Sequence, residues 1–452
     1  MKIIVCGAGQ VGKSVVSYLV KGNNDITVVD DNMLDLDEIA KEFDVLPVYG
    51  KPSHPDILEK AGAKNCDMIL AVTDVDEVNM VVCQLAYSLF AIPKKIASVN
   101  SQTFTDPLWG MLYNDKHLPI DLLISPDIDI AEQILKILQY PGCAGILPIF
   151  DKKYYIMTLN INDKCPLLGI PLLQIEKADE SLNIGFVNII RNDISFLPDM
   201  YETLQAGDQI NILVKADEVY NTISSFGLEK PANERLVIFG GNEISEYLGA
   251  EFENDDSITS CRLVEEELDR ARMLARNLNH VVVIHGEMMS DVILKEADIT
   301  SADAAIALTE NDKDNLLASL LASKNGVGTT ISVINTPSYN NLMFNITDNI
   351  LVDRSAITIS RILKEIRKAK LHEAYSIARG MGEIWEIRLG EETACGHKKI
   401  GELNLPKMCR VFALLRGENL IYPDPTTKLE IGDLILAYVD SGMIKQAEQI
   451  FC

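Results

Sequence analysis

The chain has 452 residues, of which 47% are hydrophobic and 24% charged, and its formal net charge is −25 at pH 7. This length predicts several domains, and the composition is that of a globular protein. The surplus of negative charge repels phosphate backbones and anionic lipid head groups, so we expect no direct binding to nucleic acid or to a bare membrane. The same charge favours docking on a basic protein surface, such as the cytoplasmic loops of a membrane protein.

Nine cysteines are scattered along the chain without CxxC or CxxH spacing. This pattern predicts reduced thiols in the core and excludes a disulfide framework or a zinc site. The longest apolar stretch, residues 80–92, is interrupted by Gln84 and Ser88 and is shorter than the roughly 18 residues that a membrane-spanning helix needs. The first apolar run, residues 3–6, breaks into glycines and is no signal peptide. We therefore expect a cytosolic protein.

Strand and helix patterns alternate over about the first 120 residues. Helical patterns, such as residues 79–90, separate short buried runs that are typical of parallel strands. This alternation predicts an α/β lobe with a doubly wound, parallel, Rossmann-like sheet. The expected strands are residues 3–6, 25–29, 45–48, 68–72 and 95–99.

A glycine-rich turn, residues 7–12, follows the first strand and opens a helix. Gly7 permits the tight turn, Gly9 lets the backbone approach a pyrophosphate, and Gly12 lets the helix pack on the strand. The helix N-terminus offers free N–H groups to phosphate. Asp30, after the second strand, is placed to accept hydrogen bonds from ribose hydroxyls and would repel the 2′-phosphate of NADP. The alternative is a vestigial turn that serves packing alone.

Polar residues also follow the fourth strand. Thr73 and Asp74 end it at the edge where doubly wound sheets bind ligands. Asp74, Asp76 and Glu77 form an acidic cluster that either caps a helix or holds a cation. The candidate nucleotide-binding residues of this lobe are Gly7, Ala8, Gly9, Gln10, Val11, Gly12, Asp30, Asp31, Thr73, Asp74 and Ser98.

A helix with an apolar stripe, residues 128–139, leaves this lobe after Ser125, which we expect to cap it. Short alternating segments follow, at residues 154–159, 184–190 and 209–214. Their composition and turns predict a small α+β lobe.

The same order of features begins again at residue 236. Ordered recurrence at offsets of 225 to 236 residues predicts an internal duplication. The recurring landmarks are Thr73 as Thr309, Ile134 as Ile362, Asp199 as Asp424, and Asp208 as Asp433.

The second glycine turn, residues 240–245, keeps its first glycine but carries Asn242 and Ser245 in place of the second and third. An asparagine side chain there crowds a pyrophosphate, whereas Glu265 keeps the ribose contact available. An occupied and an empty second lobe both remain open. The candidate residues here are Gly240, Gly241, Asn242, Glu243, Ile244 and Glu265.

The duplication predicts six parts. They are a first Rossmann-like lobe (1–125), a crossover helix (126–142), a small lobe (143–229), a second Rossmann-like lobe (233–352), a crossover helix (353–370) and a second small lobe (371–452).

No reaction centre is evident. A dehydrogenase needs a proton-transfer residue facing the nicotinamide, but the six histidines show no partner spacing. No GxSxG, HExxH, P-loop or kinase sequence occurs either. We expect no enzyme and no metal centre, but a sensor in which nucleotide binding shifts a conformational equilibrium.

Several segments resemble one family closely: residues 50–55, 71–74, 83–90 and 119–126, together with the glycine turn. On these segments the chain resembles, over its whole length, the peripheral nucleotide-binding subunits of the Trk potassium uptake system. Those proteins carry two tandem regulator-of-K⁺-conductance domains, each with a Rossmann lobe and a small lobe.

The resemblance implies a tetrameric ring on the cytoplasmic face of a transmembrane potassium-conducting Trk subunit. It implies NAD(H), ADP or ATP in the Rossmann lobes as ligands that gate transport. The family usually places phosphate-binding arginines after the fifth strand, where this chain has residues 97–101, Ala-Ser-Val-Asn-Ser. Loss of a charged phosphate partner can cost roughly 1.5–3 kcal/mol, which weakens the case for ATP more than that for NAD or ADP.

Two other functions remain open at this stage. One is an NAD-dependent oxidoreductase of a small substrate, which the glycine turn and Asp30 alone support. The other is a metabolite-binding scaffold that has lost nucleotide binding.

Overall fold

The computed structural model describes residues 1–451 except 21, 23, 179–183, 230, 231, 233, 336–348, 368–372, 378–380, 392 and 394. The expected boundaries at residues 233, 370 and 371, and Cys452, lie outside the described residues. The chain forms two compact units. The first comprises Met1–Asp129, Ser355–Ser376 and Ser441–Gln449, and the second Ile130–Arg354, Ile377–Asp440 and Ile450–Cys452.

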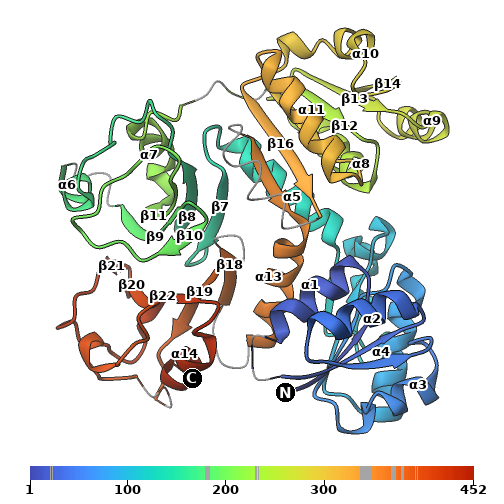
Figure 1. Cartoon of the computed structure of the whole chain (residues 1–452), viewed down its shortest axis with the longest axis horizontal. Helices are drawn as coiled ribbons and strands as arrows, with labels where there is room; N and C mark the ends of the chain where they lie inside the picture. Colours follow the sequence, from blue (N-terminus) through green and yellow to red (C-terminus); the bar gives the residue numbers. More distant parts are fainter. Residues whose placement is uncertain are drawn as a thin grey trace. The chain divides into compact units, whose positions relative to one another are not determined.

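A six-stranded parallel sheet, drawn in blue in Figure 1, forms the first Rossmann lobe in the order β3-β2-β1-β4-β5-β6. Strand order reverses between β1 and β4, and doubly wound sheets commonly bind ligands at the carboxyl ends of the strands beside such a point. The strands are β1 (Lys2–Cys6), β2 (Asp25–Asp30), β3 (Leu46–Tyr49), β4 (Met68–Ala71), β5 (Lys94–Ser98) and β6 (Leu122–Ile124).

Both faces of this sheet are covered, as expected for a parallel sheet. Ile3 and Val5 of β1 pack in a cluster with residues of α1 and α2, whereas Ile4 and Cys6 pack with residues of α3 and α4. Because successive side chains of a strand point to opposite faces of the sheet, the buried residues of β1 contribute to two hydrophobic cores, one on each face. The helices are α1 (Gln10–Leu19), α2 (Met33–Glu42), α3 (Pro55–Lys60) and α4 (Asp76–Phe90).

The second Rossmann lobe repeats this architecture in the order β14-β13-β12-β15-β16-β17. The predicted duplication of the parallel sheet is therefore confirmed. Its strands are β12 (Arg235–Phe239), β13 (Ser260–Glu265), β14 (Val281–His285), β15 (Ala304–Ala307), β16 (Thr329–Ile334) and β17 (Ile350–Asp353). Its helices are α8 (Glu243–Glu253), α9 (Leu268–Asn277), α10 (Asp291–Glu296) and α11 (Asp312–Lys324).

The small lobes are antiparallel. The first has the order β10-β9-β11-β8-β7, and the order β21-β20-β22-β19 repeats it. Their elements are β7 (Gly145–Ile149), β8 (Tyr154–Asn160), α6 (Leu172–Ala178), β9 (Gly185–Arg191), β10 (Ile194–Phe196), β11 (Gln209–Lys215), α7 (Val219–Ser225), β18 (Glu373–Ile377), β19 (Gly382–Arg388), β20 (Cys409–Arg416), β21 (Asn419–Ile421), β22 (Leu434–Asp440) and α14 (Ile444–Phe451).

Two further helices connect the lobes, α5 (Pro126–Gln139) and α13 (Arg354–Arg367). The prediction that Ser125 caps α5 through its side chain is wrong. Its carbonyl accepts from the N–H of Asp129 at 3.0 Å, but its buried hydroxyl has no hydrogen-bond partner. The Ser125 side chain therefore does not cap the helix, which begins at the next residue, Pro126.

Helix α13 completes the core of the first Rossmann lobe. Ile362 is 1% exposed and belongs to the cluster formed by α1, α2 and the sheet. The hydroxyls of Ser14 and Ser355 share a hydrogen bond of 2.8 Å, which joins α13 to α1. A segment from the second half of the sequence is thus part of the first compact unit.

Candidate nucleotide site

The three glycines of the first turn meet different surroundings. Gly7 has φ +114°, and a Cβ added to it would lie 2.6 Å from the carbonyl oxygen of Val72. A Cβ on Gly12 would lie 1.9 Å from the carbonyl oxygen of Gly7, whereas a Cβ on Gly9 would meet nothing within 4 Å. The fold itself therefore requires Gly7 and Gly12. The space beside Gly9 is open to a ligand.

The N-terminus of α1 is left available by the chain. Its N-cap residue is Gly9, no side chain caps it, and its first turn contains no acidic residue. The N–H groups and the positive end of the helix dipole are thus offered to an anion. Gln10 is exposed beside them, and Val11 is half-buried.

Asp30 binds the turn directly. Its Oδ2 accepts a hydrogen bond from the N–H of Ala8 at 2.6 Å, and its Oδ1 accepts from the N–H of Asn32 at 2.7 Å. Each carboxylate oxygen has a second lone pair, so these bonds leave acceptor sites for a ribose hydroxyl. Asp31, the next residue, is exposed.

Asn79 joins the ends of β4 and β5, a role that sequence reasoning missed. Its Oδ1 accepts from the N–H and the hydroxyl of Thr73 at 2.9 and 2.7 Å, and its Nδ2 donates to the carbonyl of Ser98 at 2.9 Å. Asn315 makes the same contacts with Thr309 and with the carbonyl of Val333. Recurrence of this Thr–Asn pair in the duplicated sequence was the signal that could have revealed it.

The acidic cluster has a structural role at Asp76. This residue is 8% exposed, and its two oxygens accept from the N–H groups of Asn100 and Ser101, each at 2.9 Å. Asp74 is exposed. Within the described residues no group of three or more His, Cys, Asp or Glu is placed to hold a metal.

The structure thus gathers most of the predicted first-lobe residues at one sheet edge. The turn, Asp30 and Thr73 lie at the carboxyl ends of β1, β2 and β4, and Ser98 is linked to Thr73 through Asn79. Lys13, one helical turn into α1, points instead to α2, where it pairs with Glu38 at 2.5 Å and Glu42 at 2.9 Å. These hydrogen bonds, first that to Glu38, raise the pKa of Lys13.

The second glycine turn repeats the backbone conformation of the first but differs in the side chain at the N-terminus of the following helix. Gly240 has φ +99°, and Glu265 repeats the contact of Asp30 by accepting from the N–H groups of Gly241 at 2.5 Å and Glu267 at 2.6 Å. Asn242, by contrast, caps α8, because its Oδ1 accepts from the N–H of Ser245 at 3.1 Å. Ile244 is 1% exposed and belongs to the core.

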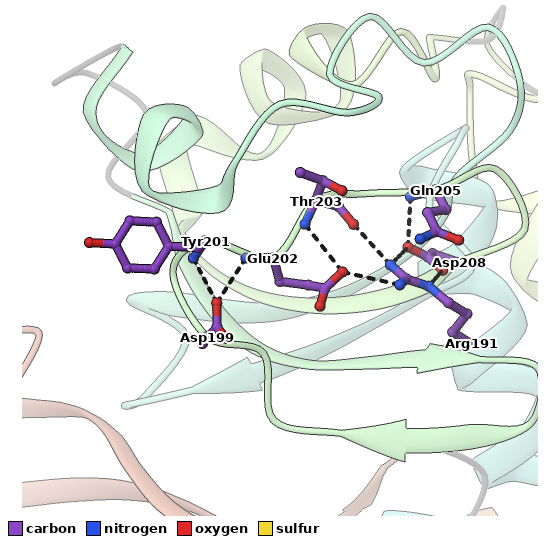
Figure 2. A network of polar contacts seen from close by, with 7 residues as sticks. All are labelled: Arg191, Asp199, Tyr201, Glu202, Thr203, Gln205 and Asp208. Carbon is purple, nitrogen blue, oxygen red and sulfur yellow. Dashed lines mark hydrogen bonds and ion pairs between the residues drawn. The ribbon is translucent and has the colours of Figure 1, made fainter.

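Each small lobe contains an Arg–Asp pair whose carboxylate is buried, and Figure 2 shows the pair of the first small lobe. Arg191 contacts Asp208 at 2.7 Å and Glu202 at 3.1 Å, and it also donates to the carbonyl of Thr203. These contacts, first that to Asp208, raise the pKa of Arg191. Arg416 and Asp433 repeat the pair 225 residues later. The landmark that recurs as Asp208 and Asp433 is therefore the carboxylate of an Arg–Asp clasp, which links the strand carrying the arginine to the turn before β11 or β22.

The cysteine prediction is confirmed for the described part of the chain, where eight cysteines are free and buried. Burial raises the pKa of the Cys143 thiol to about 12, so this thiol stays protonated. None of the described helices has the length and hydropathy of a membrane span.

Residues 3–119 and 236–352 match the TrkA-N domain family, and residues 384–451 match the TrkA-C domain family. The Trk system potassium uptake protein TrkA of Azorhizobium caulinodans is 32% identical over 100% of this chain and 98% of its own. The TrkA of Haemophilus influenzae is 31% identical over the same shares.

Solved structures agree on the fold. The crystal structure of the GsuK RCK domain has a TM-score of 0.64 at 17% identity, covering 99% of this chain and 95% of that one. The GsuK channel bound to NAD has a TM-score of 0.63 at 17% identity, covering 99% and 78%.

Two Rossmann lobes, each with an antiparallel small lobe, define a protein with tandem RCK domains. The chain belongs to the TrkA family of potassium uptake proteins. The names of its relatives describe potassium uptake and no reaction, and the expectation that the chain is not an enzyme is confirmed by its family.

Proposed function

We propose that the chain is a cytoplasmic, nucleotide-sensing subunit that regulates a transmembrane potassium-conducting subunit. Its membership of a potassium uptake family supports the transport role. The uncapped N-terminus of α1 beside the open space at Gly9 is the observation that carries the nucleotide role. Structures of GsuK bound to NAD and to ADP share the fold.

The ligand we propose is NAD(H) or ADP, bound at the first lobe. Its pyrophosphate would meet the N–H groups of α1 at Gly9, its ribose would meet Asp30, and Thr73 and Asp74 would lie beside it. Residues 98–101 supply no arginine, and the N–H groups of Asn100 and Ser101 already bond to Asp76. A third phosphate therefore gains no cationic partner there, which disfavours ATP.

Gly9→Asp tests this site. The substitution adds a negative charge where phosphate would bind, and the space beside Gly9 accepts a side chain. Thermal stabilisation by NADH, NAD and ADP should be lost. Gly110→Asp, in the same lobe and equally open, is the matched control and should keep it. Equal stabilisation of both variants would place the nucleotide elsewhere.

The partner is tested separately. We expect the chain to co-purify with a membrane potassium-conducting subunit, to do so as a tetrameric ring, and to lose the association when the N-terminal lobe is removed. Light scattering of the purified chain measures its molar mass and thus tests whether four chains assemble. NADH turnover with a substrate panel would instead favour an oxidoreductase, and binding without turnover excludes it.

A further inference from the structure

The N-terminus of α8 is satisfied by the chain's own side chains. Asn242 accepts from the N–H of Ser245, and its amide also donates to the carbonyl of Leu308. At the equivalent point of the first lobe, Gly9 has no side chain and α1 is uncapped. The donor that a phosphate would use in the second lobe is therefore already bonded.

An arginine lies over the second turn. The Nε of Arg270, on α9, donates to the carbonyl of Gly241, and its Nη2 lies 3.2 Å from Glu246 and 3.6 Å from Glu243. Its side chain is 19% exposed. This guanidinium is therefore engaged by backbone and carboxylates, and a phosphate would have to displace two carboxylates to reach it.

The N-termini of α1 and α8 differ in charge. The first turn of α8 contains Glu243 and Glu246, whereas α1 has Gln10 and Lys13 at the same positions. Acidic residues in the first turn compensate the helix dipole that would otherwise attract an anion.

We propose that Asn242, Glu243, Glu246 and Arg270 close the phosphate site of the second Rossmann lobe, so that each chain binds one nucleotide, at the first lobe. This inference rests on the proposed nucleotide role of the first lobe. In the second lobe, the side chains of these four residues would occupy the place that the nucleotide phosphates take in the first lobe.

Binding stoichiometry tests the proposal with the full chain. Titration calorimetry with ADP, and separately with NADH, should give one equivalent per chain for the wild type and none for Gly9→Asp. One equivalent retained by Gly9→Asp, or two bound by the wild type, would overturn it.

A transplant identifies the closing residues. In the Gly9→Asp background, the second lobe receives the residues of the first: Asn242→Gly, Glu243→Gln, Glu246→Lys and Arg270→Asp. The transplanted chain should regain one equivalent. A folded transplant, with an unchanged circular dichroism spectrum, that stays at zero would show that these side chains are not what closes the lobe.

The two proposals fail in different ways. A wild-type chain that binds neither ADP nor NADH contradicts the nucleotide role on which the inference rests, whereas two equivalents bound by the wild type support that role and contradict closure of the second lobe. Binding that survives in Gly9→Asp supports nucleotide sensing but contradicts closure. Arg410→Gln, a change in the small lobes, is a control that should leave the stoichiometry at one.

Discussion

Residues of the same type in one short turn are constrained by different neighbours. Gly7 and Gly12 are fixed by contacts with backbone carbonyls, whereas Gly9 faces open space. These surroundings agree with the packing roles that the motif predicts for Gly7 and Gly12. The distances separate the two glycines that serve packing from the one that is free to serve a ligand.

Gly12→Ala should therefore destabilise the first Rossmann lobe. The new methyl group would lie 1.9 Å from the carbonyl oxygen of Gly7, so α1 must move away from β1 at a cost of roughly 1–3 kcal/mol. Chemical denaturation should show a lower midpoint. Gly9→Ala, with no neighbour within 4 Å, is the matched control and should leave the midpoint unchanged. An unchanged Gly12→Ala variant would contradict the packing role.

Arg191→Met should destabilise the first small lobe strongly. Asp208 has no exposed side-chain surface, and removing its partner leaves a buried, uncompensated charge at a cost of about 3–5 kcal/mol. Denaturant unfolding measures the loss. Lys215→Met breaks an exposed pair with Asp217 and should change stability very little. Equal losses of unfolding free energy in Arg191→Met and Lys215→Met would show that the Arg191–Asp208 pair contributes no more to stability than an exposed ion pair.

At the scale of elements, the sequence predicted those helices and strands whose hydrophobic pattern lies within a short stretch of the chain. The buried run of β1, the turn after it and the helical pattern of α4 are each contained in a short window, and their types and order were predicted correctly. The position of α13 was not predictable in this way. Ile362 enters a core whose other members lie within the first 124 residues, and no local pattern encodes so distant a partner.

Ile362→Ala should loosen the first Rossmann lobe. The side chain is 1% exposed, and truncating a buried isoleucine costs about 2–5 kcal/mol. Hydrogen exchange of residues 10–19 in α1 should accelerate, although the substitution lies far away in sequence. Ile299→Ala, in the core of the second Rossmann lobe, is the control of equal size and should leave exchange in α1 unchanged. Unaltered exchange in Ile362→Ala would show that α13 does not support α1.

At the scale of the whole molecule, the duplication preserves fold more strictly than charge. The Thr–Asn pairs and the Arg–Asp clasps recur with the same hydrogen bonds. The first turn of α8 contains two acidic residues, whereas that of α1 contains none. The sequence predicted the second turn as a partial site but could not show that a side chain of α9 reaches it, because that contact depends on how α9 packs against α8.

The net charge of the chain should make its binding to the membrane partner sensitive to salt. With a formal charge of −25, the chain should bind a basic cytoplasmic face of the proposed membrane partner with a strong dependence on ionic strength. Raising sodium chloride from about 0.05 to about 0.3 M shortens the screening length to below roughly 10 Å, so we expect at least about a tenfold loss of affinity in a pull-down or interferometry assay. Sucrose of matched osmolality, which does not screen charge, is the control. An affinity that is insensitive to salt would show that apolar contacts, and not this charge, hold the chain to its partner.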